Sequence, residues 1–338
     1  MRSTGHGPRE RRLGSIVSRS NSGEIAQLVE HTTENRGVPG SSPGLAISEH
    51  RRVSPVDVAV GSKRARSYAR RPGAALLATL LVLAGATPAA AGAARGADCV
   101  VPGSHRPLAS LWRPHLRAAG AYARGRRGDI AFAVRYAGFF AGYRPDHREW
   151  SASVLKAMLL VSYLDRPNVA KRPLSARERA LLTPMITRSD DAAANTVDTI
   201  VGSAGLRATA ARAGMGSFAP VEPIWGESQI TARDQTRFFL HIDSYVAPRH
   251  RAYAMRLLAS VVPSQRWGVG RLAPRGWRLY FKGGWGSGTG LIDNQVALLE
   301  RGCARVSIAV LSMHDGSHAY GKQTLRGIFA RLLAGLPA

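Results

Sequence analysis

The sequence predicts an α+β protein in which an antiparallel sheet is assembled from both ends of the domain and helices pack on it. Short apolar segments with the β-branched and aromatic content of strands stand at residues 129–134 and 138–144, and again at 278–282, 290–299 and 305–313. The pattern between these two groups is helical. Strands on both sides of a helical middle segment are expected to pair with one another, which makes the helices an inserted subdomain.

The helices are expected in the following order. The first spans residues 107–127 and breaks near Pro114, because proline removes a backbone donor. The second, residues 153–164, reads SVLKAMLLVSYL and is apolar on nearly every face, so it must be buried on all sides. Ser175 and Thr231 each begin a capping-box pattern, with an acidic residue three positions on. The remaining helices are expected at residues 190–201, 206–213, 251–261 and 320–333.

Composition and charge exclude several classes. The 338 residues are 45% hydrophobic and 20% charged, which excludes wholesale disorder, and two cysteines exclude a disulfide-dense scaffold or a cysteine metal cage. The net charge of +25 suggests nucleic acid, but the basic excess is spread along the chain rather than clustered. The one long apolar run, residues 74–86, is too short to span a bilayer as a helix.

The chain divides into three parts. Residues 1–60 are either a disordered extension or sequence before the true start, and residues 25–46 resemble the peptide from a mistranslated transfer-RNA gene. Residues 61–94 have the basic, apolar and small-residue order of a signal peptide, with an uncleaved anchor as the alternative. Residues 95–338 form the folded domain, which we expect to be secreted or associated with the cell envelope. Export separates it from nucleic acid, so we expect no nucleic-acid partner.

Two cysteines fall in the folded domain. In an oxidising compartment Cys99 and Cys303 are expected to form one disulfide between the start and the end of the domain, and two buried thiols are the alternative.

A Ser-x-x-Lys element opens the buried helix. Ser153 and Lys156 share one helix face, so the amine can reach the hydroxyl. A lysine in an apolar helix has a lowered pKa, which suits a base that activates the serine. The alternative is that Lys156 extends to solvent and Ser153 caps the helix. If Lys156 is the base, Lys156→Arg is nearly inactive, because guanidinium does not release its proton.

Two further elements carry polar groups. Ser189, in the segment SDDAAAN that ends at Asn195, offers a second hydroxyl for proton relay, or an ordinary helix N-cap. Lys282 ends an apolar strand and is followed by Gly283 and Gly284. A lysine there can bind a carboxylate while the glycines let a substrate approach the backbone, or the segment is a turn with a solvated lysine.

Together the three elements resemble the signature of the penicillin-recognising serine enzymes, Ser-x-x-Lys, Ser-Asp-Asn and Lys-Thr-Gly, in that order. Their context is most similar to class A β-lactamases and their actinobacterial serine-hydrolase relatives. The resemblance covers about residues 105–335, and the segments at residues 225–226 and 265–268 also match the serine-hydrolase relatives. It implies a five-stranded antiparallel sheet flanked by helices, beside an all-helical subdomain.

The resemblance also assigns roles to residues. Ser153 is implied as the acylated nucleophile, Lys156 as its activating amine and Ser189 as a proton relay. Lys282 would help to bind a substrate carboxylate, and the amides of Ser153 and Trp285 would form the oxyanion hole. Asn195 matches the continuation of the second motif and is expected to be structural.

Three departures limit what the resemblance implies. Asp191 replaces an asparagine that touches substrate, and Gly283 replaces a threonine whose hydroxyl contacts the substrate carboxylate. No Glu-x-x-Leu-Asn segment lies between Ser189 and Thr231, so Glu222 is only a weak candidate for the group that activates water. A surface role is the alternative for this glutamate.

The sequence therefore predicts an exported serine hydrolase that forms an acyl-enzyme at Ser153 and acts on β-lactams or a cell-wall amide. A D-alanyl carboxypeptidase, or another amide or ester hydrolase, is the alternative among enzymes. A catalytically degenerate cell-wall-binding protein is the alternative from another class. We expect a monomer, with no metal or organic cofactor implied.

Overall fold

The computed structural model describes residues 99–286 and 291–338. The predicted N-terminal extension, residues 1–60, and the predicted signal peptide, residues 61–94, lie outside the described residues. Among the described residues, no helix is both long and apolar enough to cross a membrane.

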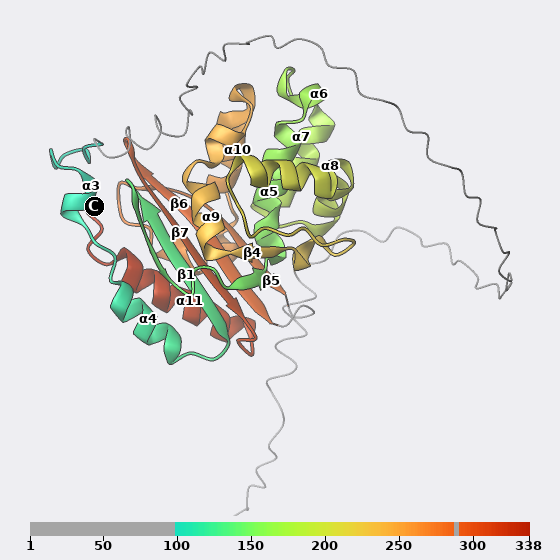
Figure 1. Cartoon of the computed structure of the whole chain (residues 1–338). Coiled ribbons are helices and arrows are strands. Elements are labelled where there is room, and N and C mark those ends of the chain that lie inside the picture. The colour runs from blue at the N-terminus through green and yellow to red at the C-terminus, as the bar shows by residue number, and fades with distance from the viewer. Residues whose placement is uncertain (1–98, 287–290) are drawn as a thin grey trace, which may run out of the picture. The chain divides into compact units, whose positions relative to one another are not determined.

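A five-stranded antiparallel sheet forms the centre of the described domain, which confirms the predicted fold class (Figure 1). The strand order is β2-β1-β7-β6-β5, so the two N-terminal strands pair directly with the last strand of the chain. The strands are β1 (Asp129–Tyr136), β2 (Phe139–Tyr143), β5 (Arg278–Gly286), β6 (Ile292–Arg301) and β7 (Ala304–Met313).

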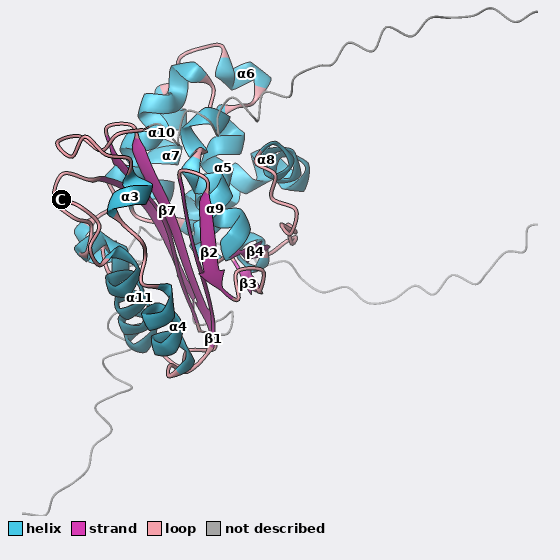
Figure 2. Ribbon diagram, turned by 60° about the vertical axis from the view of Figure 1, so that its left-hand side comes forward, coloured by secondary structure: helices cyan, strands magenta, loops and turns pink. Residues whose placement is uncertain are grey.

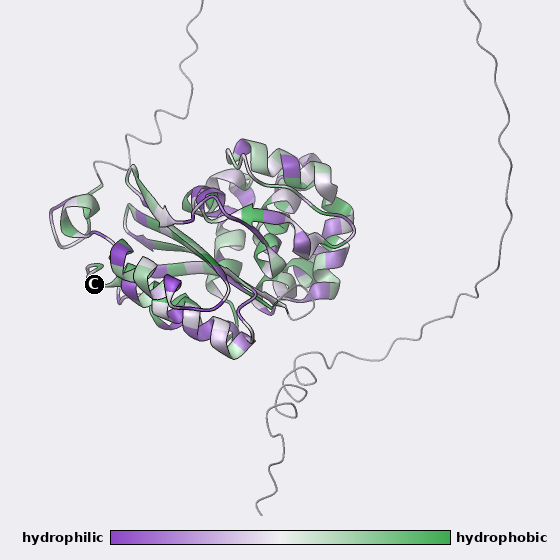
Figure 3. Ribbon diagram, turned by 60° about the horizontal axis from the view of Figure 1, so that its bottom comes forward, coloured by the Kyte–Doolittle hydropathy of each residue, from purple (hydrophilic) through white to green (hydrophobic). Residues whose placement is uncertain are grey.

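Both faces of this sheet are covered, and β1 shows how the sequence achieves it. Ala131 and Ala133 belong to one core cluster, whereas the alternate residues Phe132 and Val134 belong to a second. Helices α4 (Leu116–Arg124) and α11 (His318–Leu333) supply the second cluster, and the inserted helices supply the first (Figure 2). Hydrophobic residues follow the strands, and hydrophilic residues gather on the surrounding helices and loops (Figure 3).

The inserted helices pack around α5 (Leu155–Leu164), which is buried at every position as predicted from its uniform apolarity. The predicted helices 190–201 and 206–213 are one assigned helix, α8 (Asp191–Arg212). It is interrupted at Gly202, whose φ of 62° lies outside the helical region, so the sequence pattern had located a real break. The other helices are α3 (Leu108–Leu111), α6 (Pro167–Ala170), α7 (Ala176–Thr187), α9 (Ala232–Leu240) and α10 (Arg251–Ala259).

The two predicted capping boxes differ in the structure. At the start of α7, Ser175 and Glu178 exchange both hydrogen bonds. At the start of α9, Thr231 accepts from the Asp234 amide, but the Asp234 carboxylate accepts from the Ser217 amide instead. The second box is therefore only half formed, because a tertiary partner takes the carboxylate.

A small second sheet was not predicted. β3 (Arg148–Trp150) and β4 (Gln229–Thr231) are three-residue strands that pair antiparallel, and they connect the main sheet to the helices. Near the edge of the domain, Cys99 and Cys303 form a disulfide with a Cα–Cα distance of 5.7 Å.

Candidate active site

Ser153 lies in a tightly held turn between β3 and α5. The turn is the 3-10 helix η1 (Ala152–Val154), and Ala152 adopts a φ of 42°, a conformation that non-glycine residues rarely take. Ser151 donates its amide to Ser228 O (2.9 Å), and the Asn294 side chain donates to Ser151 O (3.5 Å). The main sheet, through β6, and the residue just before β4 together hold the turn in place, and Ser153 is 9% exposed.

The β5 strand approaches this turn closely at Gly284. A Cβ atom at that position would lie 2.8 Å from Ser153 N and 2.9 Å from Ser151 O, distances that real Cβ atoms essentially never show. Gly284 is therefore required for the strand to lie against the turn, and it brings the Lys282–Trp285 segment beside Ser153.

Lys156 is completely buried one turn after Ser153, so it does not extend to solvent. Its Nζ donates to Ser189 O (2.5 Å), Ser189 Oγ (3.1 Å) and Asp191 Oδ1 (2.6 Å). The Asp191 side chain is 74% exposed, so this ion pair joins a buried cation to a carboxylate at the protein surface.

Lys282 reaches the same hydroxyl from the sheet. Its Nζ lies 2.9 Å from Ser189 Oγ and 2.8 Å from Gly283 O, and its side chain is fully buried. Ser189 has a φ of 59°, in the left-handed region that non-glycine residues rarely adopt. Its hydroxyl therefore bridges Lys156 and Lys282, which are 126 residues apart in the chain.

The electrostatics of the two amines differ. Burial lowers the pKa of Lys156, and the charge of Asp191 and its hydrogen bond oppose that shift. Burial also lowers the pKa of Lys282, to well below its ordinary value, and the neighbouring Lys156 lowers it further. The charge of Asp191 opposes this shift too, but Lys282 has no hydrogen bond to a carboxylate within the described part of the chain.

Trp225 is a residue of this site that sequence reasoning did not assign to it. Its ring centroid lies 5.2 Å from Lys156 Nζ, and its indole N–H donates to Asn195 Oδ1 (2.7 Å). Asn195 thus holds an aromatic ring beside the buried amine. The tryptophan was noted in the sequence only as part of a resemblance, and nothing local in the sequence indicated this contact.

Glu222, the weak candidate for activating water, is not brought to this cluster. It is exposed, and its carboxylate accepts from the amide (3.3 Å) and the hydroxyl of Ser203, just past the break in α8. These hydrogen bonds lower the pKa of Glu222. Its hydrogen bonds therefore hold it against Ser203 on α8, and none of those in the described part of the chain joins it to either lysine.

Trp285, near the end of β5, lies among other aromatic rings. The Trp285 ring stacks on His318 with centroids 5.8 Å apart, and Trp267 meets both rings edge-on. His318 Nδ1 lies 2.6 Å from Asp293 Oδ1, on the strand paired with Trp285. Burial raises the pKa of Asp293 to about 8, so most of this carboxyl is protonated near neutral pH.

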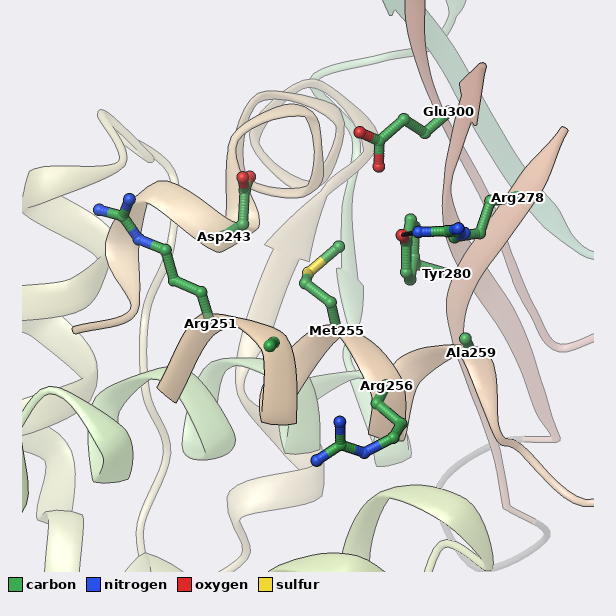
Figure 4. Close-up of a pocket in the computed structure, with 9 residues that line it drawn as sticks. Asp243, Arg251, Met255, Arg256, Ala259, Arg278, Tyr280 and Glu300 are labelled. Carbon is green, nitrogen blue, oxygen red and sulfur yellow. Dashed lines mark hydrogen bonds between the residues drawn. The ribbon is translucent and has the colours of Figure 1, made fainter. Parts of the chain in front are cut away.

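A cavity of about 470 Å³ lies elsewhere, between α10 and the first residues of β5 (Figure 4). Its lining includes Arg251, Met255, Arg278, Tyr280 and Glu300, and none of the predicted site residues. The described residues hold no group of three or more metal-ligating side chains arranged to bind a metal ion.

Residues 167–334 match the model of the β-lactamase enzyme family. This chain is a β-lactamase-like protein. The matched segment contains Ser189, Asp191 and Lys282 but begins after Ser153 and Lys156. It supports a hydrolase of the serine β-lactamase type. A search of curated protein sequences found no match.

Solved structures share the fold of this β-lactamase-like chain. The β-lactamase from Sphaerobacter thermophilus DSM 20745 is 19% identical, with a TM-score of 0.56 over 66% of this chain and 96% of that chain. An ancestral class A β-lactamase (GNCA) is 20% identical, with a TM-score of 0.56 over 65% and 98%. A β-lactamase from Xanthomonas campestris pv. campestris str. ATCC 33913 is 18% identical, with a TM-score of 0.56 over 65% and 97%.

Proposed function

We propose that this protein is an exported serine hydrolase that forms an acyl-enzyme at Ser153, acting on β-lactams or on a peptidoglycan-like amide. One observation carries the proposal: Ser189 Oγ bridges two fully buried lysines beside the turn that bears Ser153. Burying two amines is costly, so a protein retains them where their proton affinity is used. The Cys99–Cys303 disulfide, a bond typical of oxidising compartments, supports export.

In the proposed reaction the Ser153 oxygen attacks the amide carbonyl and forms an ester with its carbon. The carbon–nitrogen bond breaks, and Ser189 passes a proton to the leaving nitrogen. The Ser153 and Trp285 amides would stabilise the oxyanion, because Gly284 holds β5 against the turn.

Slow deacylation follows from the groups around Lys156. Next to this amine lie the Trp225 indole, which cannot accept a proton from water, and the Asp191 carboxylate, which is already paired with the amine. Glu222 is bonded to Ser203. Without a positioned base for water, the acyl-enzyme persists. This observation favours a transpeptidase-like enzyme or a penicillin-binding sensor over a fast β-lactamase.

Intact-mass measurement after incubation with a penicillin tests the proposal. We expect a covalent adduct on the wild type and none on Ser153→Ala, with the adduct lasting far longer than the mixing time. An adduct that decays within seconds would favour a fast β-lactamase. No adduct on the wild type, together with binding to cell-wall preparations that Ser153→Ala leaves unchanged, would favour a wall-binding protein.

A further inference from the structure

We propose that Lys282, through Ser189, is the group that accepts the proton of the nucleophile, and that Asp191 holds Lys156 as a permanent ammonium. The inference rests on the proposed acyl-enzyme function and reverses the roles that the sequence resemblance implies for the two lysines. It follows from the hydrogen bonds, the burial and the charges of the cluster.

The partners of Lys156 fit an ammonium group. An ammonium has three protons and no lone pair, and Lys156 Nζ has three acceptors: Ser189 O, Ser189 Oγ and Asp191 Oδ1. One of these is a carboxylate at 2.6 Å, which favours the charged form. If Lys156 were neutral, its contact with the Asp191 carboxylate would lack the positive charge that favours it. The amine would then have only two protons for three acceptors, so its lone pair would face one of them.

The partners of Lys282 fit a neutral amine. It donates to Gly283 O, and its other partner is the Ser189 hydroxyl, which can donate as well as accept. If Ser189 accepts from Lys156, its own proton points to the Lys282 lone pair. This arrangement gives Lys156 three acceptors and uses the Ser189 proton, the Lys282 lone pair and one Lys282 N–H.

Charge balance leads to the same assignment. Lys156 on α5 and Lys282 on β5 are both fully buried and share one hydroxyl, so two ammonium groups there would repel each other at low dielectric. Asp191 contacts Lys156, and Asp190 beside it also favours the charged form of Lys156. The charge of Asp191 also favours the charged form of Lys282, but its carboxylate contacts only Lys156. Lys282 is therefore the amine that gives up its proton.

The proton transfer during acylation then has two stages. As the Ser153 oxygen bonds to the substrate carbonyl, its proton moves to Ser189, and the Ser189 proton moves to the Lys282 lone pair. When the carbon–nitrogen bond breaks, Lys282 returns a proton to Ser189, which protonates the leaving nitrogen. No net proton is gained or lost, and Lys282 is cationic only between the two transfers.

Protonation states are measured directly by NMR of protein labelled with ¹³C at the lysine ε-carbons. The full sequence has five lysines, so the spectrum is simple, and Lys156→Arg and Lys282→Arg assign the two resonances. We expect Lys282 to lose its proton at a lower pH than Lys156 in the wild type. Loss of the Lys156 proton first would overturn the inference. This measurement needs no activity, so it is independent of the proposed function.

Acylation rates by a labelled penicillin give the second test. We expect Lys282→Arg to lower the rate by about 100-fold or more, the usual loss on removing a general base. Lys156→Arg should lower it at least tenfold less, because arginine keeps the charge beside Asp191. Lys171→Arg changes a lysine outside the cluster, so it controls for effects of a lysine-to-arginine change that do not involve the site. The opposite order of the two variants would restore Lys156 as the base.

A rescue variant separates a base from a merely structural lysine. Asp191→Asn removes the counter-ion of Lys156, which should then lose its proton at lower pH and serve as the base. We therefore expect Asp191→Asn/Lys282→Arg to acylate at least tenfold faster than Lys282→Arg alone. Equal rates would contradict the inference. If the wild type itself is not acylated, the proposed function fails, while the NMR titration still decides which lysine is charged.

Discussion

Glu149 gives the sharpest stability prediction. It lies on β3, four residues before Ser153, and is 1% exposed. Neither of its carboxylate oxygens has a hydrogen-bond partner within the described part of the chain, although His147 Nε2 lies 3.2 Å from Oε1. Burial raises the pKa of Glu149 to about 8, and the charge of Asp129 adds to the shift.

The sign of the pH effect follows from the raised pKa. Between pH 4.5 and 8 an unfolded chain has released this proton and the folded chain still binds it, so the free energy of unfolding falls as pH rises. At about 1.4 kcal/mol per pKa unit, the loss from Glu149 over this window is roughly 4 kcal/mol. Glu149→Gln removes that loss. The free energy of unfolding of the variant, minus that of the wild type, should therefore rise by roughly 4 kcal/mol from pH 4.5 to 8.

Urea unfolding at half-unit pH steps measures this difference, and other titrating groups cancel because both proteins contain them. Glu178→Gln is a control of opposite sign, since the hydrogen bond from Arg172 lowers the pKa of Glu178 to about 2. The loss of stability caused by Glu178→Gln should be fully present near pH 7 and should fade below about pH 4.5. A Glu149→Gln difference that does not change with pH would refute the argument that this carboxyl is buried protonated.

Three further predictions concern the site and the frame around it. Gly284→Ala should lower the acylation rate at least tenfold, because the new Cβ would lie 2.8 Å from Ser153 N. Gly283→Ala, whose Cβ would make ordinary contacts, should lower the rate much less. Similar losses for the two variants in stopped-flow measurements would contradict this reasoning. Glu222→Gln should change the adduct's decay less than twofold, since the carboxylate is exposed and bonded elsewhere; a long-lived adduct only in this variant would make it the deacylating base. Cys303→Ser should lower the free energy of unfolding by about 2–5 kcal/mol, because it removes the disulfide. Urea titration measures this change, and an unchanged urea midpoint would contradict a stabilising disulfide.

Much of the fold could be predicted because its signals are local. The break in α8 was visible as a helical pattern interrupted around Gly202, and the burial of α5 followed from its lack of a polar face. The β3–β4 pair could not be predicted in this way. Each strand has three residues, too few for a periodic pattern, and the pairing joins segments about 80 residues apart.

The site shows the same division. The segments that meet at Ser189 could be named from their residue types, since a lysine in an apolar helix and one at the end of an apolar strand are both unusual. What the sequence left open was which neighbour each polar group takes. Asp191 was expected to touch substrate and is bonded to Lys156, and Trp225 lies over that amine. Such contacts depend on side-chain directions fixed only by tertiary packing.

The pairing of β1 with β7 also constrains how the protein is made. A ribosome completes the first hairpin, which ends at residue 143, about 160 residues before it begins β7 at residue 304, the strand that pairs with β1. Until then the hairpin has an open edge and one uncovered apolar surface, a state in which chains aggregate or wait on chaperones. A chain that ended before residue 278 would contain Ser153 and α5 but none of β5, β6 and β7. The five-stranded sheet can therefore form only after residues 278–313 have been synthesised.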